Sequence, residues 1–321
     1  MENKMFNPSS IVTEAFLDEL VSQYIVANGT NENEIHYLVS NARNVLEIIA
    51  NSDAPYHDSN HTIMVTMVGL QIMRGKMLIE GSIPSSDWVT FVISLMHHDI
   101  GYIRGICKGD RSGRYAINDD GDTVTIPPGA TDAYLTPYHV DRAQLFIRER
   151  FTNDEFIDVE TVCQNIERTR FPVPTEEDHQ ACDDIPGLIR AADLIGQLAD
   201  PQYLRKTSSL YYEFKETGTA AKMGYTNAAD VREGYPKFFW DIVSPFIQEG
   251  LRYLRRTQEG QQWAANLYSN VFTEEHEIPA YGPERRDIDD RRRDLTTPFK
   301  VKVISEENQR IDQRRSSDAD S

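Results

Sequence analysis

The chain has 321 residues, 40% of them apolar, which is the composition of a globular protein with a sizeable core rather than of a disordered one. It carries 51 acidic and 33 basic side chains, a formal net charge of −18, which argues against general binding to nucleic acids or anionic membranes because both require a basic surface. Three widely spaced cysteines, no secretory signal pattern and no apolar run of about 20 residues predict a cytoplasmic protein without disulfides or a membrane span.

The first half of the chain shows helical periodicity. Residues 1–10 are expected to be a flexible N-terminus, and amphipathic helices are predicted at 11–27, 35–50 and 61–79. Asn60 is the expected N-cap of the third helix. Residues 88–96 are almost all apolar and predict a buried central helix, which ends in His97-His98-Asp99-Ile100 with Gly101 as a breaker.

Residues 105–137 interrupt the helical pattern because they are rich in Gly, Asp and Pro. Two short β-prone runs flank the turn residues 118–122 and predict a small β-hairpin between 105 and 128. An insertion this long in a helical domain is usually functional or mobile. Since it follows the His98-Asp99 pair directly, we expect it to act as a lid; a decorative surface insertion is the alternative.

Helical patterns resume at 138–151, 153–169, 186–199 and 201–214, and continue with interruptions to 271. Residues 284–321 are charged and polar, a composition typical of a disordered tail. The predicted fold is therefore one all-α domain over 11–283 with a small β-hairpin insertion and a disordered C-terminal tail.

Three histidines and two aspartates are candidates for one metal-dependent site. His57 and His61 are four residues apart, so a helix places them on one face, although both can simply be exposed near a helix start. Neighbouring helical residues diverge by about 100°, so His98 and Asp99 reach one ion only where their helix ends. Asp193 stands in an apolar helix and needs a partner, either a metal or a residue such as Arg190.

The segment Tyr56-His57-Asp58-Ser59-Asn60-His61-Thr62-Ile63-Met64-Val65 resembles the Tyr-His-Asn-x-x-His-x-x-x-Val signature of cyclic-nucleotide phosphodiesterases, which belong to the HD-domain superfamily. His98-Asp99 and Ala192-Asp193-Leu194 extend the resemblance over residues 50–200. It implies an HD-domain helical bundle in which the metal ligands are His61, His98, Asp99 and Asp193. By the same resemblance, His57 is the proton donor, and Asp99 bridges to a second metal supported by His139.

The resemblance is incomplete. Asp58 replaces the signature Asn, no Asp lies two residues after Asp99, and no His-Pro follows. Relatives with two metals add a histidine on the next helix, where this chain offers only Glu167. The number of ions, one or two, therefore stays open.

Basic residues near these motifs are candidates for binding a substrate phosphate, because guanidinium groups pair with phosphate oxygens. Lys108, Arg111 and Arg114 lie in the insertion, and Arg142 lies one turn after His139. Each can also be an ordinary surface charge.

The sequence thus predicts a metal-dependent phosphohydrolase that cleaves a phosphoester of a nucleotide or related small molecule by metal-activated water. Imidazole and carboxylate ligands suit Mn, Fe, Zn, Ni or Mg. The expected partner is a small phosphorylated substrate, and a homodimer stays open. The alternative is a nucleotide-sensing or partner-binding module on the same scaffold, without turnover.

Overall fold

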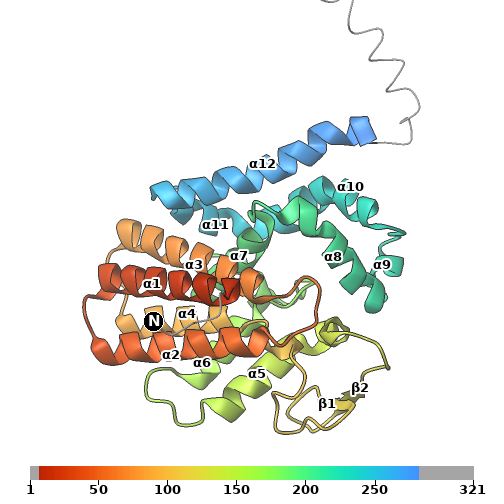
Figure 1. Cartoon of the computed structure of the whole chain (residues 1–321). Helices are drawn as coiled ribbons and strands as arrows, with labels where there is room; N and C mark the ends of the chain where they lie inside the picture. The colour runs from red at the N-terminus through yellow and green to blue at the C-terminus, as the bar shows by residue number, and fades with distance from the viewer. Residues whose placement is uncertain (1–6, 282–321) are drawn as a thin grey trace, which may run out of the picture. The chain divides into compact units, whose positions relative to one another are not determined.

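The computed structural model describes residues 7–281, and the side chains of 7–276. The described chain is mostly helical (Figure 1). Its α-helices are α1 Pro8–Asn28, α2 Glu32–Ile49, α3 Ser59–Glu80, α4 Ser85–His97, α5 His139–Arg150, α6 Val159–Glu167, α7 Ile185–Leu198, α8 Tyr203–Glu216, α9 Thr219–Lys222, α10 Ala228–Phe238, α11 Ser244–Leu254 and α12 Gln258–Tyr281. Shorter helical turns are η1 Ile100–Tyr102, η2 Asp132–Tyr138, η3 Glu177–His179 and the π-helical turn η4 Phe239–Val243. The predicted all-α fold is confirmed.

Contacts divide the chain into two units, Met1–Phe272 and Thr273–Ser321, with α12 running from one into the other. The predicted tail at 284–321 lies outside the described residues, as do residues 1–6 of the expected flexible N-terminus.

Several helices begin two or three residues earlier than the sequence pattern suggested, and the caps of α1 and α3 show why. α1 starts at Pro8, inside the segment expected to be flexible, because the Asn7 side chain accepts a hydrogen bond from the Ser9 N–H and proline suits the first helical position. α3 starts at Ser59, and its N-cap is Asp58 rather than Asn60. The Asp58 carboxylate accepts from the His61 N–H at 2.9 Å, which fixes His61 in the first turn of α3.

The core is built around α3, which packs against α4, α7 and α11. α3 and α7 approach closely because Gly196 has no side chain: a Cβ there would lie 2.6 Å from the Val65 Cα. This contact joins the second turn of α3 to the last turn of α7, about one turn along each helix from His61 and Asp193. In the described part of the chain, α3 is the one helix long and apolar enough to cross a membrane, but more than half of that stretch is buried, as in the core helix of a globular protein.

The predicted hairpin is confirmed. β1 (Arg114–Ala116) pairs antiparallel with β2 (Thr123–Thr125), and both lie beside α5 at the edge of the helices in Figure 1. The Arg148 side chain of α5 pairs with Asp119 at the hairpin turn at 2.7 Å, and Glu149 accepts from the Lys108 N–H at 2.7 Å. The hairpin is therefore anchored along α5, and its function as a lid stays a prediction.

Candidate metal centre

The end of α4 places two neighbouring residues at the same point. α4 ends at His97, and Asp99 has φ −101° and ψ 4°, outside the helical region. The backbone therefore turns directly after His98, so that His98 and Asp99 both face His61 of α3 and Asp193 of α7. The expectation that this pair depends on a helix end is confirmed.

Two imidazole nitrogens and two carboxylate oxygens converge there. The Nε2 atoms of His61 and His98 each lie 3.1 Å from Oδ2 of Asp99 and 3.5 Å from Oδ1 of Asp193. Neighbouring ligand atoms about 2.1 Å from one ion are roughly 3.0–3.4 Å apart in octahedral or tetrahedral coordination. The four side chains therefore have the spacing of ligands to one divalent ion, and this buried group can hold a metal.

Two atoms of the group lack the hydrogen bonds that buried polar atoms usually make. Among the described residues, His98 Nε2 and Asp99 Oδ2 are buried without a hydrogen-bond partner, and such orphaned atoms are costly. The opposite nitrogen of His98, Nδ1, donates to the Leu95 carbonyl at 2.7 Å. This arrangement leaves Nε2 as the ligating atom, as is usual for metal-binding histidines.

Burial disfavours the charged form of each side chain in the group, but the attraction between the imidazoles and the carboxylates shifts each pKa further in the opposite direction. The nearby carboxylates of Asp193 and Asp99 raise the pKa of His61 to about 9, and the same two carboxylates raise the pKa of His98. The two imidazoles lower the pKa of Asp193 to about 2 and hold that of Asp99 well below its usual range. Without a metal the imidazoles therefore favour their protonated forms, and a bound ion would displace protons from them.

His139, at the start of α5, lies on the other side of Asp99. Its Nε2 is 3.8 Å from Oδ1 of Asp99, whereas Oδ2 faces His61 and His98. Its Nδ1 donates to the Thr136 carbonyl at 2.6 Å, so Nε2 is again the free ring nitrogen. Burial lowers the pKa of His139, which keeps it neutral and able to ligate. The two Asp99 oxygens thus face different histidines, as a carboxylate shared by two ions would.

His57 forms an ion pair with a residue that the sequence did not single out. Its Nδ1 donates to Oε2 of Glu213 on α8 at 2.6 Å, and the other Glu213 oxygen accepts from the Tyr56 and His57 N–H groups at 2.7 and 3.2 Å. Burial lowers the pKa of His57, but Glu213 raises it more, so the net shift is upward. The pair lies at the edge of the group, since His57, His61 and Asp99 are also close enough to share an ion.

Glu213 lies beyond the 50–200 stretch that carries the family motifs. Its side chain is 2% exposed, yet it stands in the run Leu210-Tyr211-Tyr212-Glu213-Phe214. A single carboxylate within an aromatic run is the signal that could have drawn attention to it, because a buried charge needs a partner.

The neighbouring candidates are turned away from the group. His97 donates from Nδ1 to the Ile93 carbonyl at 2.9 Å and packs near Phe146 and Phe151. Arg190 donates to the carbonyls of His179 and Ala181. The alternative that Arg190 neutralises Asp193 is therefore wrong.

Arg142 does not fit the expectation that it binds a substrate phosphate. The side chain is fully buried, and its N–H groups donate to the carbonyls of Gly101, Ile103 and Ala116 and to both carboxylate oxygens of Asp110. Five N–H donors are all that a guanidinium possesses. Arg142 instead stabilises the start of the insertion against α5. It lies on α5, which runs beside η1 and the segment that follows it.

The remaining basic candidates lie on the hairpin. Arg111 donates to the carbonyls of Lys108 and Asp110, both at 2.7 Å, and Arg114 donates to the Thr123 hydroxyl at 3.0 Å. Lys108, Arg111 and Arg114 are exposed. Their contact with a phosphate stays a prediction that depends on the hairpin acting as a lid.

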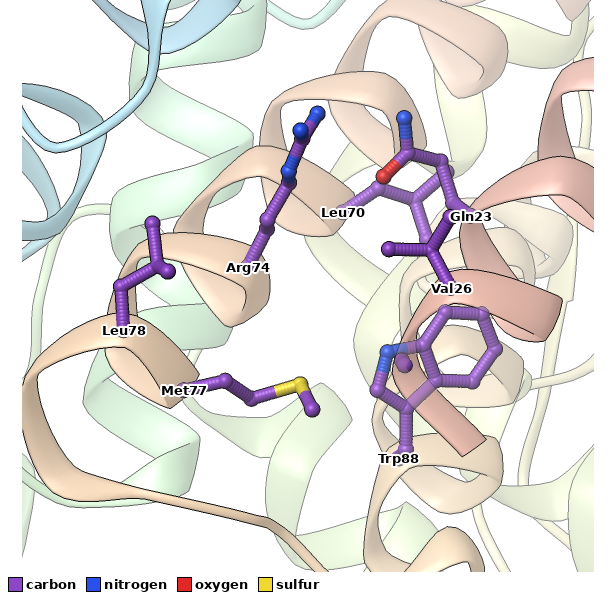
Figure 2. Close-up of a pocket in the computed structure, with 8 residues that line it drawn as sticks. Gln23, Val26, Leu70, Arg74, Met77, Leu78 and Trp88 are labelled. Atoms are coloured by element: carbon purple, nitrogen blue, oxygen red, sulfur yellow. The ribbon is translucent and has the colours of Figure 1, made fainter. Parts of the chain in front are cut away.

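An apolar pocket of about 330 Å³ lies elsewhere, between α1, α3 and α4 (Figure 2). Leu70, Arg74, Met77 and Leu78 line it from α3, and Trp88 lines it from α4. These α3 residues are roughly 14–25 Å along the helix from His61, at about 1.5 Å per residue. The pocket is therefore separate from the candidate metal centre.

The fold and the site together define an α-helical protein with a buried His/Asp group that can hold a metal ion. The chain belongs to the Npun_R2479-like family, whose pattern matches residues 6–277. That match includes every residue of the candidate centre and Glu213. A search of curated proteins finds no match.

Proposed function

We propose that this protein is an HD-domain metal-dependent phosphohydrolase. The convergence of His61, His98, Asp99 and Asp193 supports the proposal most strongly, because their spacing and two orphaned atoms match a divalent-metal site. The order of the motifs in the chain and the all-α fold agree with the HD superfamily. Both oxygens of Asp99 are directed toward histidines, so we propose that it bridges two ions, the second held by His139.

The ion would supply a water of lowered pKa as the nucleophile and would neutralise charge on the phosphoryl oxygens. The protein supplies the proton for the leaving oxygen. The proton donor is His57. Its Nδ1 is hydrogen-bonded to Glu213, so its Nε2 is the nitrogen that can donate to the substrate. The Glu213 carboxylate favours the protonated form of the His57 ring, because it raises the pKa of that ring. The proton thus leaves from Nε2 to the departing oxygen as the phosphoester bond breaks.

The substrate is a small phosphoester, a nucleotide or a related compound. The acidic chain does not favour a polymeric nucleic acid. The ligand set accepts Mn, Fe, Zn, Ni or Mg. The narrower assignment to a phosphodiesterase rests on the resemblance of residues 56–65 to that signature.

The deciding experiment combines metal analysis with turnover. Protein stripped with a chelator is reloaded with each of the five metals and assayed on phosphomonoesters, phosphodiesters, cyclic nucleotides and nucleoside triphosphates. We expect His61→Ala and Asp193→Asn to lose metal and activity together. The matched control is Asp184→Asn, since Asp184 is the N-cap of α7, the helix that carries Asp193, and asparagine caps equally well. Wild-type turnover that survives complete removal of metal would contradict the mechanism.

The same panel distinguishes the alternative. A nucleotide-sensing module would bind one of these compounds tightly while leaving it intact with every metal. If Asp193→Asn loses metal but the wild type cleaves none of the compounds, the metal site is supported and the hydrolase proposal is rejected.

A further inference from the structure

Three aromatic rings, those of His57, Tyr102 and His139, are stacked beside the candidate metal centre. The Tyr102 ring lies between His57 and His139, with centroid distances of 4.4 and 4.6 Å and interplanar angles of 15° and 22°. Tyr102 is 2% exposed. It contacts the proposed proton donor on one face and the proposed ligand of the second ion on the other.

The backbone explains why the ring is held there. Tyr102 ends η1, which begins directly after Asp99. Gly101 lies against the first turn of α5, since a Cβ at Gly101 would be 1.8 Å from the His139 carbonyl oxygen. The segment that supplies Asp99 is thus pressed against the helix that supplies His139, and the next side chain is the tyrosine between the two histidines.

Each histidine has one ring nitrogen fixed by a hydrogen bond. Nδ1 of His57 donates to Glu213, and Nδ1 of His139 donates to the Thr136 carbonyl. One hydrogen bond leaves an imidazole free to tilt about that bond, which would swing Nε2 away from its target. The flat face of Tyr102 restricts this tilt for both rings. Its hydroxyl is 3.5 Å from Nε2 of His57, at the limit of a hydrogen bond, so the ring makes the main contact.

We propose that Tyr102 is the positioning residue of the reaction: it aims Nε2 of His57 at the leaving oxygen and Nε2 of His139 at the ion shared with Asp99. This proposal rests on the proposed phosphohydrolase function. A displacement of about 1 Å in a reacting group can cost roughly 100-fold in rate. Loss of the ring is therefore expected to lower proton donation by about 10- to 100-fold.

Two esters with different leaving groups distinguish a loss of proton donation from a general loss of activity. Tyr102→Leu removes the ring and Tyr102→Phe keeps it. Both are assayed on the p-nitrophenyl and the ethyl ester of whichever phosphate class the wild type cleaves, because p-nitrophenolate departs without a proton and ethoxide does not. At saturating metal, where excess ion offsets a weaker His139 ligand, we expect Tyr102→Leu to lose about 10- to 100-fold on the ethyl ester and less than about 3-fold on the p-nitrophenyl ester. Tyr102→Phe should resemble the wild type on both.

The matched control is Tyr253→Leu. Tyr253 is also buried, on α11, and its hydroxyl bonds to Glu80 at the opposite end of α3 from His61. This variant should affect both esters equally. An equal loss on both esters in Tyr102→Leu, or a loss in Tyr102→Phe as large as in Tyr102→Leu, would overturn the proposal.

A second measurement does not depend on turnover. In a crystal structure of Tyr102→Leu we expect the His57 and His139 rings to tilt or change rotamer, with His61 and His98 in place. If neither ring moves, the positioning role is wrong even in an active enzyme. If both rings move but the wild type cleaves no phosphoester with any metal, the proposed function fails while the structural role of the stack holds. Should Tyr102→Leu not fold, Tyr102→Met provides the same comparison with a more adaptable side chain.

Discussion

Replacing Glu213 with glutamine should remove the proton donor's charge partner while leaving the fold intact. Glu213 accepts one charge-assisted hydrogen bond from His57 and two backbone hydrogen bonds. Glutamine keeps a carbonyl oxygen for the backbone N–H groups, but its NH₂ would face Nδ1 of His57 and disfavour the imidazolium. A hydrogen bond to a charged group contributes about 1.5–3 kcal/mol, which corresponds to roughly 10- to 150-fold in rate.

The assay is the turnover number on an alkyl phosphoester, together with metal content and the free energy of unfolding in urea. We expect Glu213→Gln to lose about 10- to 150-fold in turnover with unchanged metal. Glu213→Ala leaves the Tyr56 and His57 N–H groups without an acceptor and should also lose roughly 2–6 kcal/mol of stability, at about 1–3 kcal/mol per group.

The matched control is Glu216→Gln on the same helix. Glu216 accepts from the Thr131 N–H at 2.7 Å and the Thr131 hydroxyl at 2.9 Å, so it makes similar hydrogen bonds away from the metal group. Its substitution should leave turnover within about 3-fold of the wild type, far short of a lost general acid. Equal turnover in Glu213→Gln and Glu216→Gln would refute the role of Glu213.

Three further predictions concern the metal group and its support. Metal affinity should rise with pH up to at least the His61 pKa of about 9, because the ion displaces protons from the imidazoles. Calorimetry in two buffers of different ionisation enthalpy would measure this proton release. A metal affinity that is constant between about pH 6.5 and 8.5 would contradict the prediction. Asp110→Asn leaves the Arg142 charge buried without its partner and should cost about 3–5 kcal/mol in urea unfolding, against under about 1 kcal/mol for the exposed control Asp119→Asn. Gly101→Ala should force α5 away from η1 and cost about 1–3 kcal/mol or more; an unchanged unfolding midpoint would show that this approach is not tight.

The residue pattern alone determined the helical class and most elements. Apolar side chains at helical spacing gave α2, α3, α4 and α7 nearly as the structure has them, because burying one face of a helix requires that spacing. The hairpin was readable from its turn residues. The helix starts at Pro8 and Ser59 were missed, since the capping hydrogen bonds of Asn7 and Asp58 extend each helix beyond its apolar stripe.

The sequence by itself also named the residues of the candidate centre, because buried imidazoles and carboxylates need partners wherever they occur. Only the tertiary structure decided how they combine. The break after His98 turns Asp99 toward α3, and the close approach of α7 at Gly196 brings Asp193 to the same point. Glu213 and Tyr102 contact His57 at the site, whereas Arg142 is buried and paired with Asp110 of the insertion. Residues far apart in the chain meet through packing between helices, and side-chain direction at a helix end depends on backbone angles that residue type does not specify.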